Sequence, residues 1–88
     1  MLNILLLEDH TPTARSMHDV AQQAFPETDI LHANCISAAK KFLQETLFHL
    51  ALLDIHLPDG NGTDLIPALK KRNPNAMAVM TTVFDDDQ

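Results

Sequence analysis

Two short apolar runs, each of which ends on a carboxylate, constrain the fold most strongly. Residues 3–7 (NILLL) are followed directly by Glu8 and Asp9, and residues 49–53 (HLALL) are followed by Asp54. Apolar runs without polar alternation are typical of strands that are buried on both faces, as in parallel sheets. The sequence therefore predicts a sheet with at least two such strands, and acidic residues directly after both.

Helical patterns separate these strands. Thr11 can cap a first helix that Pro12 opens, and Ser37 can cap a second one. A third helix is expected over residues 64–72, where Pro67 is tolerable only because it falls in or near the first turn. The helices therefore alternate with the strands along the chain.

Two further strands, residues 29–33 and 76–83, complete a βαβαβαβ order in a single domain over residues 1–88. This order predicts an α/β fold with a mainly parallel sheet and right-handed crossovers. Ligand sites in such sheets lie beyond the carboxyl ends of the strands. The residues placed there by the sequence are Glu8, Asp9, Asp54 and Thr82.

Carboxylates that gather at one edge of a sheet repel one another unless a cation or protons relieve the repulsion. Carboxylate and carbonyl oxygens are the ligands that Mg²⁺ prefers. Beside bound Mg²⁺, Asp54 could attack a phosphoryl group and form an aspartyl-phosphate. The hydroxyl of Thr82 could then hydrogen-bond a phosphoryl oxygen.

Three motifs, in this order and at suitable spacing, resemble the receiver domain of two-component response regulators. They are LLLEDH at 5–10, LLDIHLPDGNG at 52–62 and MTTVFDD at 80–86, and the resemblance covers the whole chain. It implies a flavodoxin-like (CheY-like) doubly wound parallel sheet, with the strand order 2-1-3-4 for the strands found here.

The resemblance also implies a role for each matching residue. Asp54 matches the phosphoacceptor, and Asp9 matches the direct ligand of Mg²⁺. Glu8 matches the neighbour that acts on the metal through water, and His56 matches the position whose backbone carbonyl ligates it.

Either of two adjacent threonines could supply the switch hydroxyl of the family, the one that would hydrogen-bond a phosphoryl oxygen. Thr82 is preferred over Thr81, because residues 82–85 align better with the usual Thr-Ala-x-Asp pattern. The Glu-Asp-His run at 8–10 and Val83 resemble the LuxR/NarL-type subfamily, which carries a helix-turn-helix output domain.

The sequence departs from the family pattern after its fourth strand. A full receiver continues through a fourth helix, a fifth strand with an essential lysine and a fifth helix, whereas this sequence stops at Gln88 without that lysine. We therefore expect a truncated receiver, a fragment of a longer regulator. Its fourth strand would be an apolar edge with unpaired backbone groups, which predicts a homodimer.

The implied function is to accept a phosphoryl group from a sensor histidine kinase and to switch an output domain or partner protein, with a transcriptional output. Any enzymatic activity would be limited to self-phosphorylation and autodephosphorylation. The alternative is a phosphorylation-independent interaction module that dimerises through the fourth strand. The missing lysine favours this alternative, whereas Asp9, Asp54 and Thr82 argue against it. A haloacid-dehalogenase-like phosphatase would need an Asp-x-Asp motif, but His56 occupies its third position.

Composition excludes several other classes. The net charge of −6 and the lack of a basic stripe disfavour direct binding of nucleic acid. Cys35 is the only cysteine, so the chain has no intrachain disulfide. No apolar stretch approaches the length of a membrane span, and we expect a cytoplasmic protein without membrane contact.

Overall fold

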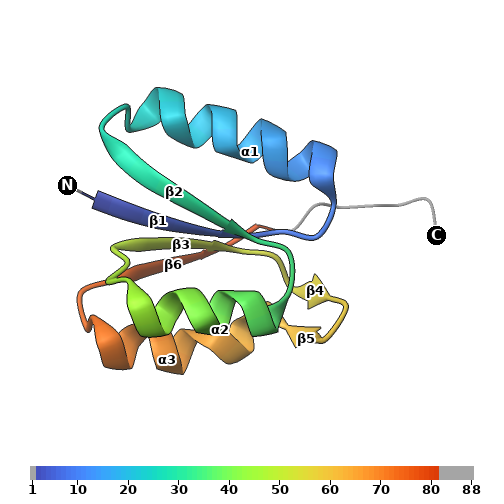
Figure 1. The fold of residues 1–88 in the computed structure, drawn as a ribbon, viewed down its shortest axis with the longest axis vertical. Coiled ribbons are helices and arrows are strands. Elements are labelled where there is room, and N and C mark those ends of the chain that lie inside the picture. Colours follow the sequence, from blue (N-terminus) through green and yellow to red (C-terminus); the bar gives the residue numbers. More distant parts are fainter. Residues whose placement is uncertain (1, 82–88) are drawn as a thin grey trace.

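Four parallel strands form the central sheet of the computed structural model, which describes residues 2–81. The order across the sheet is β2-β1-β3-β6 (Figure 1), so the predicted order 2-1-3-4 is confirmed. The strands, in chain order, are β1 (Leu2–Leu7), β2 (Thr28–Ala33), β3 (Leu50–Leu53) and β6 (Met77–Met80).

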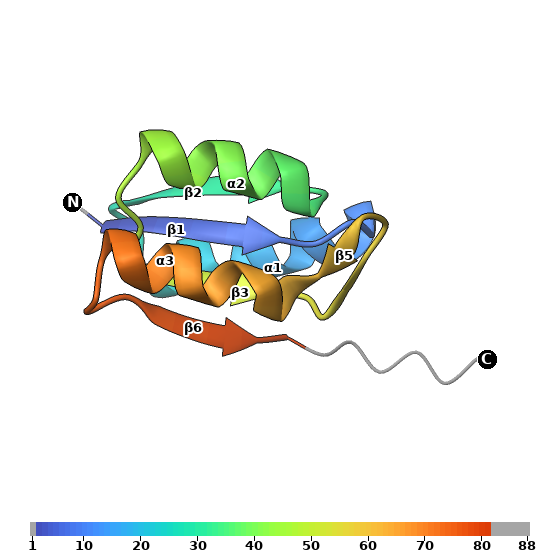
Figure 2. The same ribbon diagram turned by 90° about the horizontal axis from the view of Figure 1, so that it is seen from below.

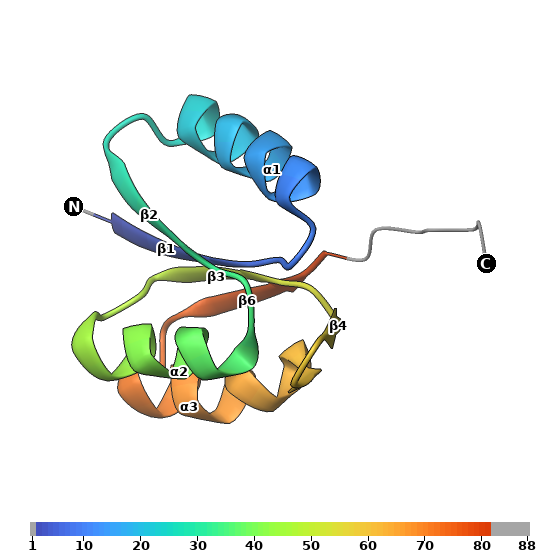
Figure 3. The same ribbon diagram turned by 45° about the vertical axis from the view of Figure 1, so that its right-hand side comes forward.

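Helices cover the two faces of this sheet unequally. Helix α1 (Thr11–Ala24) lies on one face, and α2 (Ile36–Glu45) and α3 (Ile66–Arg72) lie side by side on the other (Figures 1 and 3). Strand β6 forms one edge of the sheet (Figure 2). Within residues 2–81 no helix has the length and apolar character needed to cross a membrane.

Strand β1 is buried on both faces, as its apolar run predicts. Its side chains alternate between the two faces, and those of its last four residues are at most 1% exposed. Leu5 and Leu7 belong to the main core cluster, together with Phe48 and Leu69. This two-sided burial makes β1 the centre of the fold.

The helix starts differ from the predicted ones. Helix α1 begins at Thr11 itself, and the residue at its N-cap is His10, whose ring Nδ1 lies 2.6 Å from the Thr13 hydroxyl oxygen. The predicted cap by Ser37 is wrong, because Ser37 lies inside the first turn of α2 and Cys35 occupies the N-cap without a side-chain hydrogen bond. The first amides of α2 instead bond to another segment, described below.

The third helix begins as a 3₁₀ turn, η1 (Gly62–Leu65), and continues as α3. Pro67 falls in the first turn of α3, as predicted. At the end of α3, the Arg72 guanidinium donates two hydrogen bonds, of 3.1 and 2.8 Å, to carbonyl oxygens near the end of α2. These bonds join the two helices that share one face of the sheet.

A small hairpin, β4 (His56–Leu57) and β5 (Gly60–Asn61), follows β3 at the carboxyl end of the sheet (Figures 1 and 3). The chain then returns to β3 at Gly62, where an added Cβ would lie 1.8 Å from the carbonyl oxygen of Asp54. Only glycine permits this close approach of the two backbones.

We expect Leu5→Ala to lower the free energy of unfolding by about 2–5 kcal/mol, because Leu5 is fully buried and the change leaves a cavity. Val20→Ala is the control, since Val20 is 67% exposed on α1, and its effect should stay within about 0.5 kcal/mol. Urea unfolding measures both. Equal effects of the two changes would contradict the burial of β1.

Candidate acidic site

The carboxyl ends of β1 and β3 bring three acidic side chains together. Leu7 pairs with Leu53 in parallel register, and the Asp54 N–H donates to the Leu7 carbonyl at 3.0 Å. Each of Glu8, Asp9 and Asp54 offers a carboxylate oxygen, and these oxygens all lie within 4.8 Å of one another. The register of the two strands therefore gathers the predicted acidic cluster.

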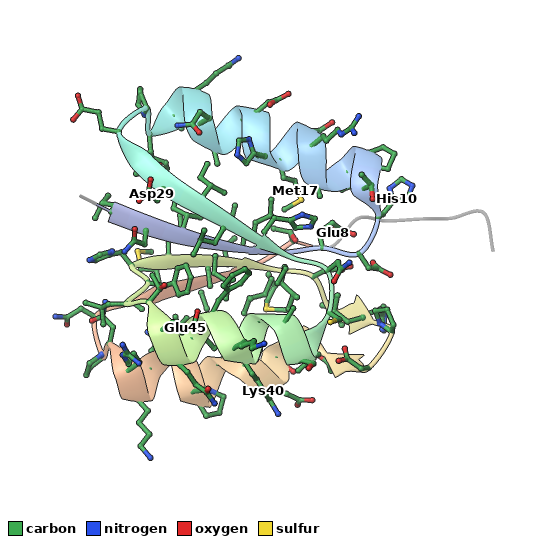
Figure 4. All side chains as sticks on the ribbon, viewed as in Figure 1. Glu8, His10, Met17, Asp29, Lys40 and Glu45 are labelled. Carbon is green, nitrogen blue, oxygen red and sulfur yellow. The ribbon has the colours of Figure 1, made fainter. Side chains whose placement is uncertain are left out.

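Glu8 is the most unusual member of this cluster, because it is only 2% exposed. Its Oε2 accepts a hydrogen bond of 3.1 Å from the His10 N–H, whereas its Oε1 is buried and has no hydrogen-bond partner among the described residues. Figure 4 shows Glu8 and His10 at the same end of the sheet. A buried carboxylate oxygen without a partner is costly and invites a cation or a proton.

The surroundings of Glu8 shift its ionisation. Burial raises the pKa of Glu8 most, the His10 N–H opposes this rise, and the charges of Asp54 and Asp9 add to it. The ring of His32, on β2, donates from Nε2 to the Glu8 carbonyl oxygen at 2.8 Å, which fixes the backbone at this point. The fold therefore holds Glu8 in a place where its negative charge is disfavoured.

Asp54 and Asp9 are more accessible than Glu8. Asp54 is half-buried, and its Oδ1 accepts a hydrogen bond of 2.7 Å from the Ile55 N–H. Asp9 is exposed. One oxygen of Asp54 is thus held by the backbone, and its carboxylate remains within reach of a ligand.

The other predicted site residues lie close by or outside the described part. His56 is exposed and opens β4, two residues after Asp54. Thr82, the preferred switch hydroxyl, lies outside the described residues. Thr81, the second candidate, follows β6, and its N–H donates to the Leu53 carbonyl at 2.8 Å. Because Leu53 pairs with Met80, the register places Thr81 beside Asp54.

Thr81 has a second notable property. Its Oγ1 is buried and finds no hydrogen-bond partner within residues 2–81. A buried hydroxyl without a partner is uncommon in native proteins.

The cluster suits a hard divalent cation. Every side-chain donor in it is a carboxylate oxygen, and one of these oxygens, Glu8 Oε1, is buried without a protein partner. Mg²⁺ and Ca²⁺ both prefer oxygen ligands, whereas the cluster contains none of the sulfur or imidazole ligands typical of zinc sites. Glu8, Asp9 and Asp54 together could hold such a cation.

Sequence reasoning missed one residue of this region, Asp59. Its Oδ1 accepts from the Ile36 N–H at 2.8 Å, and its Oδ2 accepts from the Ser37 N–H at 3.0 Å. Both bonds lower the pKa of Asp59, and the bond from the Ile36 N–H lowers it most. The sequence shows Asp59 only as part of a Pro-Asp-Gly turn, because its partners lie 23 and 22 positions away along the chain.

Comparison with known proteins agrees with this geometry. The profile of the response regulator receiver domain matches residues 4–88. The DNA-binding transcriptional activator DevR/DosR of Mycobacterium tuberculosis is 30% identical over 89 residues, which cover 100% of this chain and 41% of DevR/DosR. The chain thus spans less than half the length of this relative.

Solved structures show the same fold. The MaeR response regulator bound to beryllium trifluoride superposes with a TM-score of 0.75 at 32% identity, over 98% of this chain and 70% of MaeR. A response regulator from Burkholderia pseudomallei, with a phosphorylated aspartic acid, a calcium ion and citrate, has a TM-score of 0.82 at 21% identity. That alignment covers 99% of this chain and 50% of the other.

The strand order and the acidic residues at the carboxyl edge of the sheet agree with the profile match, which covers residues 4–88. The chain belongs to the response regulator receiver domain family. The resemblance drawn from the sequence motifs is confirmed, whereas the LuxR/NarL-type subfamily and the truncation stay predictions.

Glu8→Gln is expected to raise the free energy of unfolding of the metal-free protein at neutral pH, because it removes a disfavoured buried charge. The folded pKa of Glu8 lies above its ordinary value of 4.5. The stability that its protonated form contributes is therefore complete below that value and is lost as pH rises through the folded pKa. The advantage of Glu8→Gln should thus be small in acid and grow with pH.

Urea unfolding in the presence of a chelator, from about pH 4 to about pH 8, measures this difference. Glu27→Gln is the matched control, since Glu27 is exposed, and it should change stability little. An advantage of Glu8→Gln that does not vary with pH would contradict the electrostatic account of the site.

Proposed function

We propose that this receiver domain is a phosphorylation switch in which Asp54 accepts a phosphoryl group from a sensor histidine kinase. The observation that carries the proposal is the placement of the half-buried Asp54 carboxylate within 4.8 Å of the Glu8 and Asp9 carboxylates. In the proposed site Asp9 and Asp54 would bind Mg²⁺ directly, Glu8 would act on it through water, and His56 would contribute its backbone carbonyl.

In the proposed reaction, one carboxylate oxygen of Asp54 forms a bond to phosphorus. The bond between phosphorus and the histidine nitrogen of the kinase breaks at the same time, and the electron pair leaves with that nitrogen. The Ile55 N–H holds Asp54 Oδ1, which orients the carboxylate and leaves the other oxygen to attack. Bound Mg²⁺ supplies neutralisation of the charge on the transferring oxygens.

The phosphorylated side chain of Asp54 would carry a charge of roughly −1.5 to −2, in place of the single negative charge of the carboxylate. We propose that the Thr82 hydroxyl donates a hydrogen bond to a phosphoryl oxygen and that the end of β6 carries this change to an output domain or partner. DevR/DosR is a DNA-binding transcriptional activator, which supports a transcriptional output. The net charge of −6 argues against direct contact of this segment with nucleic acid.

Incubation with acetyl phosphate and Mg²⁺ should add one phosphoryl group to the protein, and intact-mass spectrometry measures the addition. Asp54→Asn should abolish it, because the amide is a poor nucleophile. Asp29→Asn is the matched control, since Asp29 lies near the amino end of β2, away from the site, and it should be phosphorylated like the wild type. A folded wild type without any addition would contradict the proposal and favour the phosphorylation-independent module.

We also propose that the chain forms a homodimer through β6. Within the described residues β6 pairs with β3 alone, so its outer edge presents unpaired backbone groups. Two apolar side chains of this strand, Met77 and Val79, are 64% and 42% exposed. An apolar edge strand of this kind favours pairing with a second chain.

Sedimentation velocity should show a dimer whose population rises with protein concentration. Val79→Lys should shift the protein to the monomer, because a charge on an edge strand opposes pairing. Val20→Lys, an equally charged change on exposed α1, should leave the dimer intact. A wild type that stays monomeric at every concentration would refute the dimer.

A further inference from the structure

Helix α2 begins without a cap of its own. The first N–H groups of a helix have no partner inside the helix, and a side chain at the N-cap usually satisfies one of them. Cys35 occupies the N-cap of α2 in an extended conformation and makes no side-chain hydrogen bond. The first amides of α2 are therefore free to bond to an acceptor from another segment of the chain.

Asp59 is that acceptor. It lies in the turn between β4 and β5, and each of its two carboxylate oxygens accepts one N–H, from Ile36 at 2.8 Å and from Ser37 at 3.0 Å. A carboxylate at a helix N-terminus is favoured both by these donors and by the helix dipole. The two bonds also explain why the pKa of Asp59 is lowered.

The base of the same hairpin is fixed independently. The Gly62 N–H donates to the Ile55 carbonyl at 2.9 Å, and a Cβ at Gly62 would collide with the Asp54 backbone. Between these two anchors, His56 pairs with Asn61 in the β4–β5 ladder. The hairpin is therefore held at its base against β3 and at its tip against α2.

From this arrangement we infer that Asp59 is a positioning residue, which ties the loop after Asp54 to α2 and thereby fixes the His56 carbonyl relative to Asp54. The inference rests on the function proposed above, because the loop matters only if His56 and Asp54 serve the Mg²⁺ site. Asp59 itself does not contact the metal in this account. It acts through the backbone of the hairpin.

The two hydrogen bonds between Asp59 and α2 tether the hairpin to that helix, and loss of this tether should weaken Mg²⁺ binding. Residues that orient metal ligands typically contribute 10- to 100-fold to metal affinity, and we expect Asp59→Ala to raise the Kd for Mg²⁺ by about 10-fold. Asp59→Asn should have a smaller effect, since its amide keeps one of the two acceptor oxygens. The amide resonances of Ile36 and Ser37 should shift in both variants, because they lose or change their acceptor.

A double variant separates the tether from the helix cap. Cys35→Ser places a capping hydroxyl at the N-cap of α2, so Cys35→Ser combined with Asp59→Ala restores a cap without joining α2 to the hairpin. We expect this double variant to regain stability in urea while its Mg²⁺ affinity stays about 10-fold weaker than that of the wild type. Asp29→Ala removes the same charge far from the site and should keep wild-type affinity.

Titration of the full chain with Mg²⁺ alone, followed by NMR, gives the affinities. Wild-type affinity in Asp59→Ala, or its recovery in the double variant, would overturn the positioning role, and so would equal weakening by Asp29→Ala. A wild type that binds Mg²⁺ but takes no phosphoryl group from acetyl phosphate overturns the proposed function, while the Mg²⁺ affinities still decide the role of Asp59. A wild type that binds no Mg²⁺ overturns both.

Discussion

The register of β1 between its two parallel neighbours is the constraint on which the site depends. Leu7 pairs with Ala33 on one side and with Leu53 on the other, so the residues that follow β1 and β3 lie next to each other. A slip of one residue would send every β1 side chain to the opposite face of the sheet. Such a slip would move Asn3 or Glu8 to a position that a fully buried apolar side chain occupies, which is costly. The core thereby determines where Glu8 meets Asp54.

This register also brings carboxylates that repel one another into the site. A parallel sheet places the carboxyl ends of neighbouring strands at one edge, and here the ends of β1 and β3 are both followed by acids. Glu8 is buried there with one oxygen unpaired among the described residues, which disfavours its charged form. In the proposed function the repulsion among these carboxylates favours the binding of a divalent cation. Glu8 therefore destabilises the metal-free protein and stabilises the metal-bound one.

The alternation of strands and helices and the acidic cluster could be predicted because their signals are local, in apolar runs that end directly on Glu8 and Asp54. The strand order came instead from the resemblance to the receiver family. The helix starts could not be predicted to the residue, because the backbone conformation decides which residue is the N-cap. The observed N-caps lie one or two residues before the predicted ones. The role of Asp59 is harder still to predict from the sequence, because Asp59 caps α2 from a turn 23 positions away from Ile36. Its neighbours in sequence indicate a turn and nothing about that partner. Thr82 lies outside the described residues, so its predicted role stays a prediction.

The proposed phosphorylation switch and the positioning role of Asp59 both require that Glu8, Asp9 and Asp54 form one divalent-cation site. Titration with Mn²⁺, a paramagnetic substitute for Mg²⁺, tests it most directly, because Mn²⁺ broadens the amide resonances of nearby residues. If the three carboxylates bind one cation, broadening should begin at residues 8–10 and 54–56, Mg²⁺ should compete with it, and Asp9→Asn should abolish it. Broadening that is spread over the acidic surface, or that centres on exposed acids such as Asp29, would contradict it.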